Sequence, residues 1–325
     1  MDKLSHLAQR VAGRMSGPDQ TFTGFAIDTR QIQRGEVFVA LAGEKVDGHE
    51  FVAMAARQGA AGALVQKWQD VDLPQVVVPD VLHSLQRYAS QWRSQFDIPL
   101  IGVTGSNGKT TVKEMLAAVL GQAGPVLATQ GNFNNHIGMP LTLCKLRETH
   151  RMAVIEMGAN HAGEIAELAA IAKPNAGIVT MAGAAHLEGF GSLDTIAKTK
   201  GGMFESLPEG GLAVINNDDV YAPMWRDMAS HCRQLSFGLQ PGADVTAQDI
   251  ADDDNGGSRF ILQSPMGTVA VSIPLPGQHN VMNALGAAAI ALGLGLTPAH
   301  VDSGLGGMQS VSGRLRIVPG INGAR

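Results

Sequence analysis

The stretch TGSNGKTT (104–111) combines residue types that suit phosphate binding. Gly105 and Gly108 allow the backbone to turn its N–H groups inward around an anion, and Lys109 adds a positive charge that can reach the outer phosphates of a nucleotide. Thr110 supplies a hydroxyl for Mg²⁺. The strict phosphate-loop pattern has glycine where Val103 stands, so the sequence indicates a variant loop. The alternative is a glycine-rich turn without a ligand.

The segments on either side of this loop have the order that a phosphate loop requires. IPLIGV (98–103) predicts a buried parallel strand. TVKEMLAAVLGQAG (111–124) has helical spacing and ends at Gly121 and Gly124. Strand, loop and helix therefore follow one another as needed.

Alternating strand and helix patterns predict an α/β protein of two domains. Residues 1–97 indicate a small α/β amino-terminal domain. Residues 98–313 indicate a P-loop-type domain, with a mostly parallel sheet that carries helices on both faces and binds ligands at the carboxyl ends of its strands. Residues 244–277 are β-rich, with a turn at Asn255-Gly256-Gly257, and predict an antiparallel extension of that sheet. A helix is expected to resume at Asn280.

Composition narrows the class of protein. The 325 residues are 45% hydrophobic and 16% charged, with a net charge of -5, so neither a disordered chain nor a broad basic surface for nucleic acid is expected. Cys144 and Cys232 cannot form a disulfide framework and lack metal-like spacing. The amino terminus predicts an amphipathic helix instead of a signal peptide, and the longest apolar run (284–296) is too short to span a bilayer. These features favour a soluble cytoplasmic protein without membrane insertion.

Two kinds of polar residue stand where function is expected. Glu156 ends one predicted strand and His186 follows another, so both are candidate Mg²⁺ ligands, although each alone is a weak signal and a structural histidine is common. Lys198 and Lys200 stand at the start of a predicted amphipathic helix, where lysine does not favour the helix dipole. Solvated surface lysines are the simpler interpretation on helix physics alone.

The carboxyl-terminal third offers a candidate base-binding pair. Asn280 and Asn283 are three residues apart at a helix start, so both can face one side and bind a flat base edge. Ordinary N-capping would explain Asn280 but not Asn283. Arg314, beside a glycine, suits either a phosphate clamp or a surface salt bridge.

Seven ordered motifs resemble the Mur ligase family, which builds the peptidoglycan precursor in the bacterial cytoplasm. They are GVTGSNGKTTVKEM, GNFNNHIGMPLTL, EMGANHAGEIAELA, AHLEGFGS, AKTKG, GQHNVMNALGAAA and GRL. The resemblance implies a ligase in which ATP converts a peptide carboxylate into an acyl phosphate that an amine then attacks. The motifs are most similar to members that join D-Ala-D-Ala to UDP-N-acetylmuramoyl-tripeptide. Alternatives are a sister ligase that adds diaminopimelate or lysine to the dipeptide precursor, and a non-catalytic nucleotide-binding protein.

The resemblance also implies roles for individual residues. The segment 27–51 is similar to the family segment that holds the uridine and diphosphate of the sugar nucleotide. The candidates in this segment are Asp28, Thr29, Arg30, Asp47 and His49. Two further residues, Asn134 and Asn135, are expected to line the cleft for that substrate. A structural turn explains any one of the first five equally well. The residues expected to bind ATP are Gly105, Ser106, Asn107, Gly108, Lys109, Thr110, Thr111, Asn280, Asn283 and Arg314.

Two magnesium sites follow from the same resemblance. Thr110 and Glu156 would hold one Mg²⁺, and His186 would help to hold the second. In this family a lysine is carbamylated by CO₂, and the matching position is Lys200, so Lys109, Lys200 and His186 are the expected catalytic residues. Close relatives have glutamate where Gly202 stands here, which weakens the match.

The end of the chain is the larger departure from the family. A third, carboxyl-terminal domain is expected after residues 314–325, so these residues would begin a linker to it. We expect a truncated, monomeric and poorly active form that still binds the sugar nucleotide.

Overall fold

The computed structural model describes residues 2–184, 187–253 and 256–308. The chain folds into two compact units. The first comprises residues 1–97 together with 136–147, and the second comprises residues 98–135 together with 148 onward.

The first unit contains a five-stranded sheet in the order β2-β7-β6-β5-β4, in which β2 and β7 are antiparallel and the other pairs are parallel. Its strands are β2 (Arg14–Ser16), β4 (Phe25–Ala26), β5 (Val37–Val39), β6 (Gly62–Val65) and β7 (Gln75–Val77). A separate two-stranded sheet pairs β1 (Asp2–Lys3) with β3 (Thr21–Phe22). The short segment 21–26 is therefore divided between two sheets.

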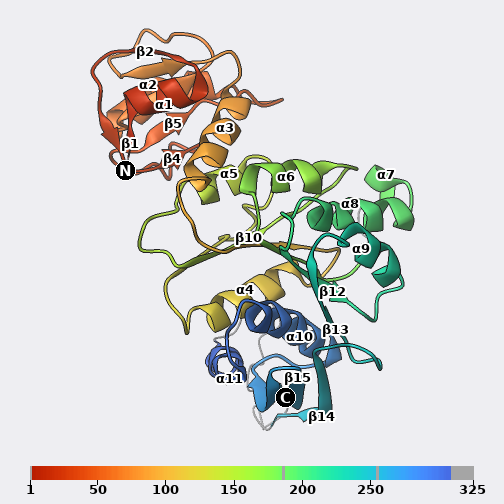
Figure 1. The fold of residues 1–325 in the computed structure, drawn as a ribbon. Coiled ribbons are helices and arrows are strands. Elements are labelled where there is room, and N and C mark those ends of the chain that lie inside the picture. Colours follow the sequence, from red (N-terminus) through yellow and green to blue (C-terminus); the bar gives the residue numbers. More distant parts are fainter. Residues whose placement is uncertain (1, 185–186, 254–255, 309–325) are drawn as a thin grey trace, which may run out of the picture. The chain divides into compact units, whose positions relative to one another are not determined.

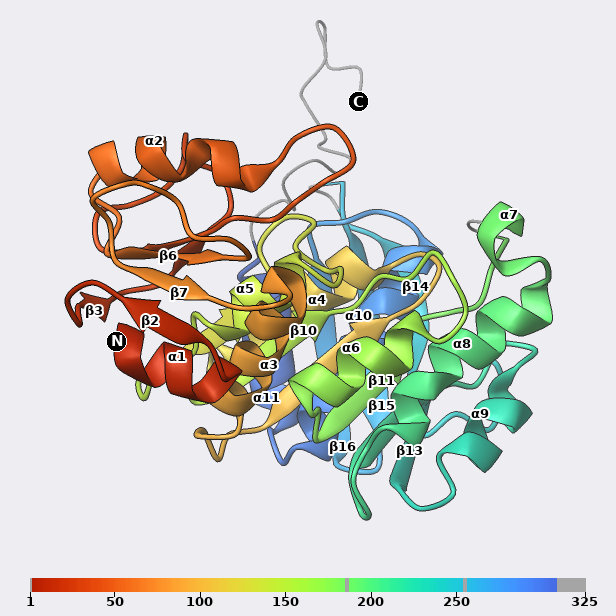
Figure 2. The same cartoon turned by 90° about the horizontal axis from the view of Figure 1, so that it is seen from above.

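Helices cover both faces of the five-stranded sheet because side chains along β6 alternate between them. A Cβ on Gly62 would lie 2.9 Å from Leu4 Cδ1 of α1, whereas Ala63 and Val65 share a core with Val52 and Ala55 of α2. Figure 2 shows these two helices on opposite sides of the sheet. The helices of this unit are α1 (Leu4–Val11), η1 (Gly48–Phe51, a 3-10 helix), α2 (Val52–Arg57), α3 (Val81–Arg93) and α5 (Gly138–Leu143). The predicted amphipathic amino-terminal helix is confirmed in α1, whose buried residues are Leu4, Leu7, Ala8 and Val11.

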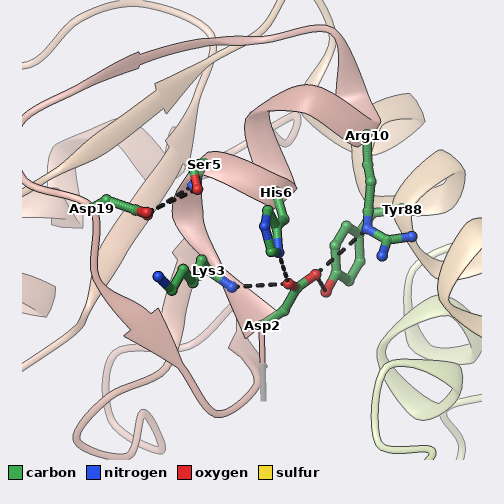
Figure 3. Close-up of polar contacts among 7 residues, drawn as sticks. All are labelled: Asp2, Lys3, Ser5, His6, Arg10, Asp19 and Tyr88. Carbon is green, nitrogen blue, oxygen red and sulfur yellow. Dashed lines mark hydrogen bonds and ion pairs between the residues drawn. The ribbon is translucent and has the colours of Figure 1, made fainter.

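The Asp2 carboxylate joins the amino-terminal strand to α1 and α3 (Figure 3). It accepts hydrogen bonds from the Lys3 N–H (2.9 Å), the Tyr88 hydroxyl (2.9 Å) and His6 Nδ1 (2.7 Å), and Arg10 Nε lies 3.5 Å away. Burial raises the pKa of Asp2, but the hydrogen bonds from His6, Lys3 and Tyr88 outweigh burial and lower it below its ordinary value. The network therefore fastens three elements through one ionised group.

The second unit is built on six parallel strands in the order β13-β12-β11-β8-β10-β9. From β8 the chain first fills one side, with β9 and β10, and then crosses to β11 on the other side. The carboxyl end of β8 is therefore a topological switch point, where open α/β sheets bind ligands. The strands are β8 (Leu100–Thr104), β9 (Val126–Ala128), β10 (Met152–Glu156), β11 (Ala176–Val179), β12 (Leu212–Asn216) and β13 (Arg233–Phe237).

Helices cover both faces of this sheet, as predicted (Figure 1). On one face α4 and α10 contact each other and the strands, and α6 and α8 do so on the other. The helices are α4 (Lys109–Leu120), α6 (Glu164–Ala172), α7 (Leu187–Phe190), α8 (Leu193–Glu205), α9 (Ala222–Met228), α10 (Gln278–Gly293) and α11 (Pro298–Gly306). The first of them begins at Lys109, two residues before the predicted helix, so the phosphate loop runs directly into its first turn.

The β-rich segment after β13 does not extend the parallel sheet, and that prediction was wrong. Three strands form their own antiparallel sheet in the order β14-β15-β16, namely β14 (Thr246–Asp252), β15 (Ser258–Ser264) and β16 (Gly267–Ile273). Phe260, Leu262 and Val271 of this sheet share a core with α4, α10 and the parallel sheet. Apolar and polar side chains alternate along these strands, so one face of the small sheet is apolar. This face is buried against helices, and the strands therefore do not have to pair with an edge strand of the larger sheet.

Candidate functional site

The loop after β8 has a backbone that its two glycines make possible. Gly105 has φ +148° and Gly108 has φ +83°, values that side chains with a Cβ rarely adopt. Gly108 is also the N-cap of α4, and no side chain caps the helix there. The helix dipole favours an anion at this end of α4.

Neighbouring strand ends fasten this loop. The Thr104 hydroxyl donates to the Met157 carbonyl after β10 (2.8 Å), and the Thr180 hydroxyl after β11 donates to the Asn107 carbonyl. On the same side, the Ser106 N–H donates to the Met181 carbonyl (2.9 Å). Thr180 was not among the residues expected from the sequence, although a polar residue at the carboxyl end of a predicted strand is a recognisable signal.

Lys109 and Thr110 follow the loop as the first two residues of α4. Lys109 Nζ donates to the carbonyls of Gly105 (2.7 Å) and Ser106 (3.3 Å), so its charge lies within the loop. The Thr110 hydroxyl makes no hydrogen bond to any described residue. An amine and a hydroxyl so placed can serve phosphate oxygens and a magnesium ion.

Glu156 ends β10, the strand beside β8, with its side chain buried (1% exposed). Its Oε1 accepts a hydrogen bond from Asn134 Nδ2 (2.8 Å), whereas the buried Oε2 has no hydrogen-bond partner among the described residues. A buried carboxylate oxygen without a partner is costly unless a cation binds it. This atom therefore fits a Mg²⁺ ligand, and Asn134 orients the carboxylate.

Lys200 is buried (4% exposed) in the middle of α8, so the alternative of a solvated surface lysine at a helix start was wrong for this residue. Lys198, two residues earlier, is exposed. Burial, with a smaller contribution from the positive charge of Lys109, lowers the pKa of Lys200 to about 8. Its Nζ lies 6.0 Å from the centre of the Phe190 ring and makes no hydrogen bond or ion pair to a described residue. Lys200 is thus a buried amine that loses its proton more readily than an ordinary lysine.

Asn280 and Asn283 face one side of α10, as their spacing predicts. Asn283 Nδ2 donates to Asn280 Oδ1 (3.4 Å), and Asn283 Oδ1 fills the space that a Cβ on Gly108 would need. Helix α10 begins at Gln278 with Gly277 as N-cap, so N-capping does not explain Asn280. Instead, Asn280 Nδ2 donates to the Pro276 carbonyl (2.7 Å).

Within the described ranges, no group of three or more His, Cys, Asp or Glu side chains could hold a metal ion. One carboxylate and one hydroxyl nevertheless suit Mg²⁺, which keeps several waters and usually binds with substrate phosphates. His186 and Arg314, the other expected ligands of metal and phosphate, lie outside the described residues.

In the first unit, the expected sugar-nucleotide residues form local pairs. Arg30 donates from Nε to Asp28 Oδ1 (3.0 Å) and from Nη2 to Asp28 Oδ2 (2.7 Å), so its charge is already balanced. Hydrogen bonds from Arg30 lower the pKa of Asp28. The buried Thr29 hydroxyl donates to Met54 Sδ (3.3 Å).

Asp47 and His49 form the second pair at η1. Asp47 Oδ1 accepts from the His49 N–H (3.0 Å) and lies 2.6 Å from His49 Nδ1, while His49 Nε2 accepts from the Gln66 N–H (2.8 Å). These contacts define a neutral imidazole that carries its proton on Nδ1. A cavity of about 300 Å³ adjoins the pair and is lined by Asp47, His49, Glu50, Gln66, Lys67 and Gln69. Among the described residues, no hydrogen bond or ion pair links this pair to Asp28 and Arg30.

Asn134 and Asn135 belong to the second unit. Asn134 contacts Glu156, as described above, and Asn135 is exposed. In the described part of the chain, no helix has both the length and the apolar character of a membrane span.

Comparison with known proteins identifies the family. Residues 103–291 match the Mur ligase middle domain, and residues 21–95 match the Mur ligase family catalytic domain. The chain is 42% identical to UDP-N-acetylmuramoyl-tripeptide--D-alanyl-D-alanine ligase of Escherichia coli, over 96% of this chain and 69% of that protein. For the enzyme of the same name from Bacillus subtilis, the identity is 35%, over 97% and 69%. This chain belongs to the Mur ligase family.

Solved structures agree with this assignment. MurF from Acinetobacter baumannii superposes with a TM-score of 0.91 at 34% identity, over 98% of this chain and 71% of that one. MurF ligase from Thermotoga maritima, solved in complex with ADP, gives a TM-score of 0.77 at 28% identity, over 90% and 67%. The chain thus spans about 70% of the length of these relatives.

Proposed function

We propose that this chain is an ATP-dependent amide ligase of peptidoglycan precursor synthesis that joins D-Ala-D-Ala to UDP-N-acetylmuramoyl-tripeptide. Relatives from Escherichia coli, Bacillus subtilis and Haemophilus influenzae carry that activity in their names, at 42%, 35% and 39% identity. The observation that carries the proposal is Glu156 Oε2, a buried and unpartnered carboxylate oxygen among the described residues, on the strand next to the phosphate loop.

In this proposal the phosphate loop binds ATP. The first-turn N–H groups of α4 and Lys109 Nζ stabilise negative charge on the transferred phosphoryl group. Ser106, Asn107 and Thr111 complete the loop, and Asn280 and Asn283 contact adenine. Arg314 is proposed as a phosphate ligand.

Thr110 and Glu156 would hold one Mg²⁺, which supplies charge neutralisation at the phosphates. Burial of Glu156 and its hydrogen bond from Asn134 fix the carboxylate before the metal arrives. His186 and Lys200 are proposed to serve a second Mg²⁺.

Lys200 would serve as a carbamate. Its neutral amine attacks CO₂, a C–N bond forms, and one proton leaves to solvent, so a buried neutral amine becomes a buried anion. The lowered pKa supports this proposal, because only the unprotonated amine is nucleophilic. ATP would phosphorylate the tripeptide carboxylate, giving an acyl phosphate and ADP. The amine of D-Ala-D-Ala would then attack the acyl phosphate, giving an amide, phosphate and a proton.

The sugar nucleotide is proposed to bind Asp28, Thr29, Arg30, Asp47 and His49, with Asn134 and Asn135 lining its cleft. Because Arg30 is paired with Asp28, diphosphate would have to compete with that carboxylate or bind the exposed edge of the guanidinium. We further propose that residues 1–97 act as the sugar-nucleotide domain and 98–313 as the ATP-binding domain, and that the protein is a cytoplasmic monomer.

Calorimetric titration tests the assignment. UDP-N-acetylmuramoyl-tripeptide and the corresponding dipeptide precursor are titrated separately into the chain with Mg²⁺ and a non-hydrolysable ATP analogue. Tighter binding of the tripeptide is expected. Preference for the dipeptide would favour the sister ligase that adds diaminopimelate or lysine. Binding of the analogue without either sugar nucleotide would instead indicate a non-catalytic nucleotide-binding protein.

A further inference from the structure

Helix α4 carries a second lysine, Lys113, one turn after the phosphate-loop lysine. Its side chain is only 1% exposed. This charged residue is therefore buried on a helix that also carries the core residues Val112, Met115 and Leu116. Lys113 Nζ donates to the Thr129 carbonyl (2.6 Å) and contacts Glu114 Oε1 (2.8 Å). A buried lysine contributes little net stability compared with an apolar side chain of similar volume, so its contacts call for another explanation.

The residue that Lys113 holds is the start of the loop around Glu156. Thr129 directly follows β9, and its N–H donates to the Val154 carbonyl of β10 (3.0 Å). The Thr129 hydroxyl in turn accepts a hydrogen bond from the Glu156 N–H (3.0 Å). Lys113 is therefore connected to the backbone of Glu156 through one buried threonine, itself 1% exposed.

The far end of the same loop holds the side chain of Glu156. Asn134 Nδ2 donates to Glu156 Oε1 (2.8 Å), and the Asn134 carbonyl accepts from the Gly158 N–H (2.9 Å). Residues 129–134 thus hold both the backbone and the carboxylate of Glu156, and the Lys113 ammonium anchors their first residue to α4. The helix that begins with the phosphate loop and the strand that ends with Glu156 are coupled by this path.

We propose that Lys113 is a positioning residue that aims the free oxygen of Glu156 at the cation bound with the nucleotide. This inference rests on the proposed function of Glu156. Lys113 contacts neither nucleotide nor metal in the proposal and acts only through Thr129. Outer partners of this kind commonly change metal affinity by about 10- to 100-fold when they are removed.

The first test measures binding of a non-hydrolysable ATP analogue to the full chain by calorimetry, in EDTA and over a series of Mg²⁺ concentrations. Lys113→Met keeps the apolar stem and removes the donor. We expect the Mg²⁺ concentration at half-maximal effect to rise by about tenfold or more, with affinity in EDTA within about twofold of the wild type. Equal losses with and without Mg²⁺ would show a merely structural role and would overturn the proposal, as would an unchanged Mg²⁺ requirement.

Matched variants separate the parts of the path. Glu114→Gln removes the charged partner of Lys113 but leaves its hydrogen bond to Thr129, so the wild-type Mg²⁺ requirement is expected. Thr129→Val removes the acceptor of the Glu156 N–H and should raise the Mg²⁺ requirement as Lys113→Met does. Thr129→Ser keeps the hydroxyl and should show the wild-type Mg²⁺ requirement. If Lys113→Met does not fold, the threonine pair carries the test, and equal Mg²⁺ requirements in that pair would overturn the proposal.

A metal-free measurement completes the design. Amide hydrogen exchange without nucleotide or Mg²⁺ should be faster around residues 129–134 and 152–158 in Lys113→Met and Thr129→Val, and unchanged in Glu114→Gln. Wild-type exchange rates in the first two variants would contradict the path. If the wild type itself shows no Mg²⁺-dependent nucleotide binding, the proposed function fails, which is a different outcome from failure of the path.

Discussion

Asn283 of α10 lies directly against Gly108, the N-cap of the phosphate-loop helix. Its Oδ1 atom fills the space that a Cβ on Gly108 would need, and φ at this glycine is +83°. A side chain at this position would therefore meet backbone strain and a polar neighbour at once.

Gly108→Ala is expected to lower the free energy of unfolding by about 2 kcal/mol, roughly half of it from the left-handed backbone. It should also weaken ATP-analogue binding by about tenfold or more, because Asn283 must move from the proposed adenine site. Gly210→Ala is the matched control, since Gly210 has φ +71° with no atom within 4 Å of a Cβ. The control should lose stability without losing nucleotide affinity; equal affinity losses in both variants would contradict a specific role for the Gly108–Asn283 contact.

Glu156→Gln should separate stability from metal binding. The amide keeps an acceptor for Asn134 and replaces a buried charge, so thermal unfolding is expected at the same or a higher temperature. Calorimetric binding of the ATP analogue should lose most of its dependence on Mg²⁺. A variant that keeps the wild-type Mg²⁺ dependence would exclude Glu156 as a ligand.

Lys200 should make stability depend on alkaline pH. Because its pKa in the folded state is about 8, below the ordinary 10.5, the unfolded chain binds more protons between these values, and stability rises with pH across that window. The penalty is fully present below pH 8 and amounts to about 3 kcal/mol. Urea unfolding of the wild type and Lys200→Met, in CO₂-free buffer from pH 7 to 10, should therefore show the variant's advantage shrinking as pH rises. A constant difference would contradict a buried protonated amine.

Asp2 should make the first unit sensitive to acid. Its pKa is lowered in the folded state, so its stabilising contribution is present above its unfolded pKa near 3.8 and is lost as pH falls through the folded value. Asp2→Asn should cost about 1–3 kcal/mol at pH 7 through the weakened contacts to His6, Arg10 and Tyr88, and this difference should shrink toward pH 2. Hydrogen exchange of α1 and α3, followed as a function of pH, measures the difference. The exposed Asp19, which accepts hydrogen bonds from Ser5, supplies the control Asp19→Asn, with a smaller expected effect.

Local patterns in the sequence determined the phosphate loop, the helix after it and the mostly parallel sheet with helices on both faces. Glycine positions, a lysine beside a threonine and runs of apolar residues act over a few residues, so they can be recognised without the fold. The same is true of Glu156, because a polar residue at the end of a buried strand is visible in sequence. Ordered motifs likewise indicated the Mur ligase family, which the comparisons confirm.

Only the tertiary structure decided which residues meet and which are buried. Helical pattern alone favoured a surface position for Lys200, yet packing of α8 buries it. The partners of Glu156 come from a loop more than twenty residues earlier in the chain. Lys113 contacts that loop from helix α4. The antiparallel strands form a separate sheet because their apolar face packs on helices. The strand pattern alone is equally compatible with pairing to an edge of the parallel sheet. Burial and long-range hydrogen bonding depend on the whole chain, since each is a property of the assembled layers and not of any one segment.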